Sequence, residues 1–154
     1  MKVTEDSYRI AAVNHIGVAQ DLVDSGQYSL ASYLAGLAVE CMLRAYSHRT
    51  AGEFEARHDL RLWYKRSKFD VFVPASRSDE TSTAIALVIG QWNNSQRYYS
   101  LELLRAEWKF AGLSRGIRGD FVKECTHQLV DAAWTIVLLG EEQWKNSFTK
   151  SKNY

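Results

Sequence analysis

With 154 residues, the chain is long enough for one domain with a buried core. Its composition, 46% hydrophobic and 24% charged, excludes disordered and fibrous proteins. The 19 lysine and arginine residues nearly balance the 18 aspartate and glutamate residues. No whole-molecule field would therefore hold a polyanion, and any nucleic-acid binding must be local. We expect a single domain over residues 1–154, with 146–154 as a frayed tail.

The first two predicted helices are long. In residues 4–24 the candidate core side chains recur at helical spacing, and they are Tyr8, Ala12, His15, Ala19 and Leu22. Ser25-Gly26 ends this helix. Residues 28–49 place small side chains and a methionine on one face, namely Ala31, Ala35, Ala38 and Met42. Small residues let a neighbouring backbone approach closely, so we expect this second helix at the centre of the bundle.

Shorter segments follow. A helix is predicted over 59–69, with Asp59 at the positive end of its dipole, then a loop over 70–78, a helix over 79–92 and another over 99–113. A Gly-rich basic turn over 112–119 precedes the last helix, 120–148. Its predicted buried face comprises Val122, Cys125, Leu129, Ala132, Ile136 and Leu139. The pattern predicts an all-α, up-and-down helical bundle of about five helices.

Cysteine usage and the N-terminus indicate a cytoplasmic protein. Cys41 and Cys125 lie in apolar helical contexts without C-x-x-C spacing, which disfavours a disulfide framework and a zinc site. The segment MKVTEDSYRI lacks the apolar region of a signal peptide, and no uncharged run approaches membrane-spanning length. We expect no membrane association, no metal and no cofactor.

Three segments share a pattern in order and spacing. The first is 33–45, YLAGLAVECMLRA, in which small residues precede Glu40 and a leucine-basic-alanine triplet; the second is His58-Asp-Leu, entering a short helix; the third is Arg97-Tyr98. Together, over about residues 28–100, they resemble the HEPN family. The family usually has proline after the Arg-Tyr pair, whereas this chain has Tyr99. The resemblance implies a nucleotide- or RNA-associated helical domain of a toxin–antitoxin or defence system, a nucleotidyltransferase-like protein partner and a homodimer.

Many members of the family are metal-independent RNases with Arg and His four to six residues apart. RNA cleavage of this kind needs a base that removes the ribose 2′-OH proton and a cation that stabilises the negative charge of the phosphorane. The only match here, Arg9-x5-His15, lies in the first helix, and about one match is expected by chance. His15 is better explained as a hydrogen-bonded core histidine. Arg118 and His127 have a more family-like place, but on one continuous helix they would face opposite sides, so they require a dimer or Arg118 in the Gly-rich turn.

The family-matched polar residues are candidates for a nucleotide or RNA surface. They are Glu40, Arg44, His58, Arg97 and Tyr98. Arg97 can hold a phosphate bidentately and Tyr98 can stack on a base. Alternatively, Glu40 and Arg44 form an intrahelical ion pair, and Glu40, His58 and Arg97 form a buried structural cluster.

Two E-x-x-H matches, Glu55 to His58 and Glu124 to His127, are typical of di-iron bundles. The first flanks a helix start and the further glutamates have no evident place, so we expect no metal site. Three functions stay open: a partner domain that binds nucleotide or RNA without strong catalysis, an RNase acting across a homodimer with Arg118 and His127, and a purely structural interaction module.

Overall fold

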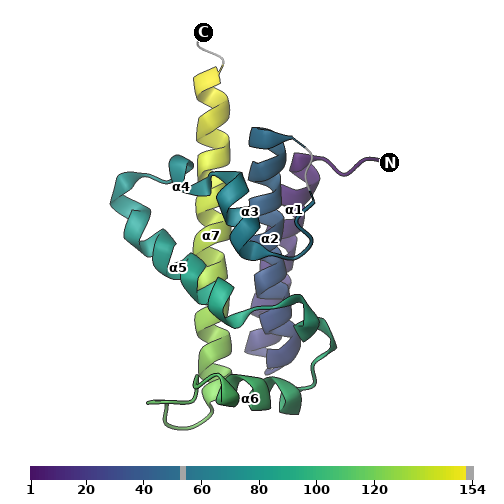
Figure 1. Ribbon diagram of the computed structural model, residues 1–154, viewed down its shortest axis with the longest axis vertical. Coiled ribbons are helices and arrows are strands. Elements are labelled where there is room, and N and C mark those ends of the chain that lie inside the picture. Colours follow the sequence, from purple (N-terminus) through teal and green to yellow (C-terminus); the bar gives the residue numbers. More distant parts are fainter. Residues whose placement is uncertain (53–54, 152–154) are drawn as a thin grey trace.

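Three long helices lie side by side in the computed structural model, which describes residues 1–52 and 55–151, with side chains as far as residue 146. They are α1 (Glu5–Asp24), α2 (Tyr28–Ala51) and α7 (Phe121–Ser151), and they follow the long axis of the molecule (Figure 1). Within the described ranges every regular element is helical. The all-α bundle predicted from the sequence is confirmed.

Shorter elements connect α2 to α7. They are α3 (Leu60–Ser67), α4 (Phe69–Phe72), the 3-10 turn η1 (Ala75–Arg77), α5 (Ser78–Gln91), the 3-10 turn η2 (Asn94–Tyr98) and α6 (Leu101–Phe110). In Figure 1, α5 lies obliquely beside α7, and α6 crosses the end of the bundle opposite the two chain termini. The predicted loop 70–78 was wrong, since it contains most of α4 and all of η1.

Short polar side chains decide where several helices begin. The hydroxyl of Thr4 accepts from the amide of Ser7 before α1, and the carboxylate of Asp59 accepts from the amide of Leu62 before α3. Ser100 caps α6 in the same way, so this helix starts two residues after the predicted position 99. Each cap satisfies a backbone N–H that has no partner within its helix.

The core is centred on α2, as the small-residue face predicted. Ala31, Ala35, Ala38 and Met42 are all buried. Gly36 shows why small residues are needed, because a Cβ atom built there would stand 2.1 Å from the ring of Trp92, which follows α5. The backbone of α2 and the Trp92 ring are therefore in direct contact.

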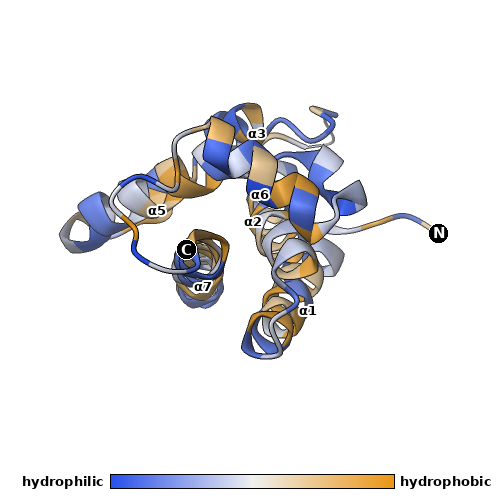
Figure 2. Cartoon of the chain, turned by 90° about the horizontal axis from the view of Figure 1, so that it is seen from below, coloured by the Kyte–Doolittle hydropathy of each residue, from blue (hydrophilic) through white to orange (hydrophobic). Residues whose placement is uncertain are grey.

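The last helix buries the face predicted for it. Val122, Cys125, Leu129, Ala132, Ile136 and Leu139 are all buried, and α7 continues to Ser151, beyond the predicted end at 148. Residues 152–154 of the predicted frayed tail lie outside the described residues. Viewed along the axis, α7 stands between α5 and α1 (Figure 2). No helix in the described ranges is both long and apolar enough to cross a bilayer.

Candidate functional site

Glu40 is the buried centre of a charged network on α2. Only 2% of its surface is exposed. The Nε of Arg44, one turn later, donates to Glu40 Oε1 at 2.9 Å, which confirms the predicted intrahelical pair. His58 Nδ1 lies 2.9 Å from Oε2 of the same carboxylate, while the His58 side chain keeps 39% of its surface exposed. One buried carboxylate thus joins α2 to the segment that enters α3.

Arg44 extends this network toward the loop before α3. Its guanidinium lies 4.4 Å from the ring centroid of Trp63 and donates to the carbonyl of Arg57, which also accepts from Trp63 Nε1 at 2.8 Å. Burial by itself lowers the pKa of Arg44, but the charge of Glu40 and its hydrogen bond raise that pKa overall. Arg44 therefore stays charged and holds the chain around Arg57 against α2.

Arg97 and Tyr98 lie elsewhere, on the exposed η2 turn. The Arg97 guanidinium is 4.5 Å from the Tyr98 ring centroid, and Tyr98 is 75% exposed. The expected buried cluster of Glu40, His58 and Arg97 is wrong in its third member, because the tight turn buries Gln96 and leaves Arg97 at the surface. Arg44 takes the predicted place of Arg97 beside Glu40.

Tyr33 of α2 links the two groups of candidate residues. Burial raises the pKa of Tyr33, the charge and hydrogen bond of Arg97 lower it, and the charge of Glu40 raises it. Both side chains are thus within electrostatic reach of the Tyr33 hydroxyl. The sequence contains a signal for Tyr33, because Tyr33 and Glu40 are seven residues apart and therefore share one face of a helix.

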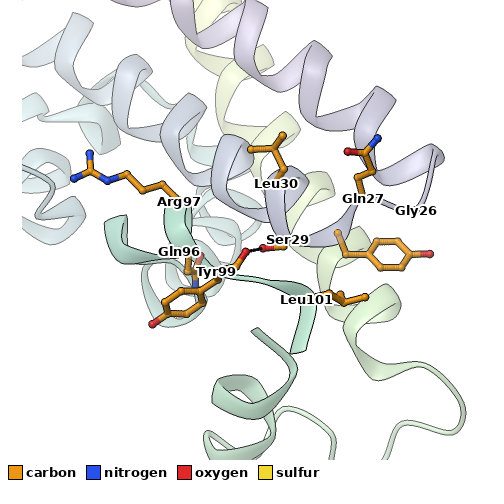
Figure 3. A pocket seen from close by; sticks show the side chains of 9 residues that line it. Gly26, Gln27, Ser29, Leu30, Gln96, Arg97, Tyr99 and Leu101 are labelled. Atoms are coloured by element: carbon orange, nitrogen blue, oxygen red, sulfur yellow. Dashed lines mark hydrogen bonds between the residues drawn. The ribbon is translucent and has the colours of Figure 1, made fainter. Parts of the chain in front are cut away.

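A cleft of about 210 Å³ lies between the α1–α2 turn and η2. Its lining includes Gln27, Ser29, Gln96, Arg97 and Tyr99 (Figure 3). The Ser29 hydroxyl donates to the Tyr99 carbonyl at 2.6 Å and so fixes the end of η2 to the first turn of α2, while the Arg97 side chain extends away from this bond. Sequence reasoning missed Ser29 and Gln96, whose roles depend on the turn.

Arg118 and His127 stand in different elements. Arg118 is exposed in the segment before α7, where Gly116 and Gly119 adopt φ values of 74° and 86°, a conformation that favours glycine. His127 is half-buried on α7. No hydrogen bond joins them in the described part of the chain. Because Arg118 precedes the helix, the argument from opposite faces of one helix does not apply to the pair.

The Arg9 and His15 pair has structural explanations. Arg9 Nη1 donates to both carboxylate oxygens of Glu141 at 2.8 and 2.9 Å, and its Nε donates to Asp6 at 3.1 Å, so Arg9 ties α1 to α7. His15 is half-buried rather than in the core, burial lowers its pKa, and it makes no hydrogen bond among the described residues. The expected hydrogen-bonded core histidine was wrong.

The E-x-x-H residues serve other contacts. His58 binds Glu40, Glu55 lies 3.5 Å from Arg44, and Glu124 accepts from Gln128. Across residues 1–52 and 55–146, no group of three or more His, Cys, Asp or Glu side chains could hold a metal ion. Cys41 and Cys125 are free thiols, and burial raises the pKa of Cys41 to about 12.

Comparison with protein-family models, curated proteins and solved structures found no match to this chain. The resemblance to the HEPN family therefore depends on the three sequence segments alone. The geometry of their side chains divides them into two sets. Glu40, Arg44 and His58 satisfy one another, while Arg97 and Tyr98 face solvent.

Proposed function

We propose that the chain is a HEPN-like domain of the cytoplasm that binds a nucleotide or RNA at the η2 turn. The observation that carries this proposal is the exposed pair of Arg97 and Tyr98. No carboxylate in the described part of the chain pairs with Arg97, so its guanidinium, which also hydrogen-bonds Tyr33, keeps further donors for a phosphate. The buried free thiols of Cys41 and Cys125 suit a reducing compartment.

The chemistry of the turn suits a single nucleotide unit. A guanidinium can donate two parallel hydrogen bonds to a phosphate, and an exposed phenol ring can stack on a base of any sequence. The cleft beside Arg97 is lined by Ser29 and Gln96, but the Ser29 hydroxyl donates to the Tyr99 carbonyl and the buried Gln96 amide donates to the Gln91 carbonyl. The ligand contacts therefore come from Arg97 and Tyr98. Glu40, Arg44 and His58 form a separate network, which Tyr33 connects to Arg97, and His58 keeps 39% of its side chain exposed.

Titration of ATP and a short single-stranded RNA against purified protein tests the proposal. Arg97→Ala should weaken binding by about 10- to 100-fold, since hydrogen bonds to charged groups contribute about 1.5–3 kcal/mol each. Tyr98→Ala should cost about 1–3 kcal/mol for each stacked base. Arg61→Ala, which removes one exposed arginine from α3, is the matched control and should bind like wild type.

Equal affinity of wild type and folded Arg97→Ala protein for both ligands would remove Arg97 from the site. Absence of any binding would favour the third function considered for this chain, a purely structural interaction module. The resemblance also implies a homodimer and a nucleotidyltransferase-like partner. A nucleotidyltransferase-like protein encoded next to this chain and forming a defined complex with it would support that setting.

A second candidate function is metal-independent RNA cleavage across a homodimer. The observation that favours it is the exposed position of Arg118 before α7, which frees it to approach the His127 of another copy. Cleavage of RNA in EDTA that is lost in His127→Ala but retained in His15→Ala would support this function. Intact RNA after incubation with concentrated protein would exclude it.

A further inference from the structure

An acidic cleft runs between α5 and α7, apart from the η2 turn. Its volume is about 380 Å³. Ala84 and Leu87 of α5 and Ala132 of α7 form the apolar floor, and Asp79, Glu80 and Asp131 contribute carboxylates. The α5 sequence contains no lysine or arginine. Arg77 pairs with Glu80 and Glu142, and no ion pair of Asp79 or Asp131 is present among the described side chains.

The outward face of α6 has the opposite character. Leu103, Ala106 and Phe110 are exposed at spacings of three and four residues, which places them on one side of the helix. Phe110 is 96% exposed and Leu103 is 48% exposed. A contiguous apolar stripe of this kind marks an interaction surface more often than a scattered exposed side chain does.

Cations lie close to Phe110 in the chain. Lys109 is exposed on α6, and Arg115 and Arg118 are exposed in the segment that follows it, while Arg105 pairs with Asp120 at 3.6 Å. Glu107 is half-buried and accepts from the Tyr99 hydroxyl, so it adds little negative charge to the outer surface. The exposed carboxylate of α6, Glu102, lies in the first turn, far along the helix from Phe110. The surface around Phe110 is thus apolar and basic.

We propose that α6 of one copy of this chain docks into the α5–α7 cleft of a second copy, with Phe110 as the anchor. The acidic cleft complements the cations around Phe110, and it would repel a nucleic-acid backbone. Within one copy the two surfaces cannot meet, because α6 crosses the end of the bundle (Figure 1), while the cleft is lined by residues of α5 and α7. The contact therefore joins different patches of two molecules, and two such contacts made reciprocally would form a two-fold dimer.

Sedimentation velocity over a concentration series measures the association. Wild type should associate, and raising the salt concentration should weaken the association because the complementary charges are screened. Phe110→Glu blocks the α6 surface and should raise the dissociation constant by at least about 30-fold, the loss typical of a hot-spot side chain. Asp131→Lys blocks the cleft and should act similarly. Val71→Glu and Asp21→Lys, at exposed positions outside both surfaces, are the matched controls.

Mixing the two blocked variants gives the decisive result. Phe110→Glu keeps an intact cleft and Asp131→Lys keeps an intact α6, so each alone should be monomeric while the mixture forms a one-to-one dimer that cannot extend. Both positions are exposed, and far-UV circular dichroism checks that the variants are folded.

Three outcomes would overturn the proposal: a wild type that stays monomeric at every concentration, a Phe110→Glu protein that associates like wild type, or a mixture that stays monomeric. Loss of RNA binding in Phe110→Glu without a change in self-association would also overturn the proposal, since the apolar stripe of α6 would then bind nucleic acid. None of these measurements involves Arg97, so failure here leaves the proposed nucleotide site untouched.

Discussion

Two side chains reach the buried Glu40 carboxylate from different directions. Arg44 comes from the same helix and His58 from the segment before α3. A buried ion pair adds little stability when complete, but removal of one partner leaves an uncompensated charge in a medium that solvates it poorly. The network is thus sensitive to loss of Glu40 in a way that a surface pair is not.

Glu40→Gln should lower the free energy of unfolding by about 3 kcal/mol, because Arg44 would keep its charge without its buried partner. Urea denaturation measures this as a lower midpoint at an unchanged slope. Glu142→Gln is the control, since that carboxylate is exposed and its pair with Arg77 is long, at 3.5 Å. Similar losses in both variants would contradict the assignment of Glu40 as the centre of the network.

His15 should make the fold less stable in mild acid. Burial lowers its pKa below the ordinary value of about 6.5, so the unfolded chain binds more protons than the folded chain as pH falls through this region. Stability is therefore lost as the pH falls below about 6.5 toward the lower folded-state pKa. Titration of the His15 imidazole by NMR checks the shift, and His15→Gln should reduce the acid-side loss. A midpoint at or above the ordinary value would refute the explanation.

Local spacing predicted one half of this network and not the other. The Glu40–Arg44 pair follows from four residues of separation on one helix, which the sequence states directly. The contact of His58 with Glu40 was suspected only from a family pattern, and Arg97 was assigned to the wrong neighbours. Its position depends on a 3-10 turn whose direction no local spacing determines.

At the scale of elements, the helices of eight or more residues were predictable, whereas the four-residue α4 and the 3-10 turns were not. The buried residues of α2 and α7 recur with helical periodicity over many turns, so each further turn strengthens the prediction of a helix. By contrast, α4 has four residues, and a helix that short is not stable by itself. It forms where the ring of Phe69 packs edge-on against Tyr46, 5.1 Å away, a contact that only the folded core provides.

Gly36→Ala should destabilise the protein by about 1–3 kcal/mol, because the added methyl group meets the Trp92 ring at 2.1 Å and forces one helix to move. Gly17→Ala is a matched helical control with open space around its Cβ position. There the same change should stabilise by about 0.5–1 kcal/mol, since alanine is the better helix former. Thermal unfolding should show shifts of opposite sign, and two shifts of the same sign would contradict the close packing at Gly36.

For the whole molecule, the first and last helices are tied by an ion pair between residues 132 positions apart. Arg9→Ala should lower the free energy of unfolding by about 1 kcal/mol, because the hydrogen bonds from Arg9 Nη1 to Glu141 are partly shielded from water. Arg77→Ala, which also faces two carboxylates but on an exposed surface, should leave stability unchanged. Equal losses of unfolding free energy in the two variants, measured by urea denaturation, would show that the ion pair between α1 and α7 stabilises the fold no more than an exposed pair does.

The arrangement of the surfaces was the part least accessible from sequence. The spacing of Arg9 and His15 matches the RNase pattern, yet the guanidinium of Arg9 donates to Glu141 of α7, more than a hundred residues away. The α5–α7 cleft likewise combines residues from two distant segments. Periodicity reveals which side of a helix is buried, but only the packing of helices reveals which exposed sides adjoin one another.

The contact between Gly36 and Trp92 also constrains how such a chain can diverge. Positions 36 and 92 share one fixed volume, because the indole ring occupies the space that a side chain on α2 would need, and its Nε1 donates to the Tyr33 carbonyl at 2.9 Å. A lineage that enlarges position 36 must reduce position 92 in the same step or shortly after. Among descendants of this sequence the two positions should covary, with glycine opposite tryptophan and larger residues opposite smaller rings.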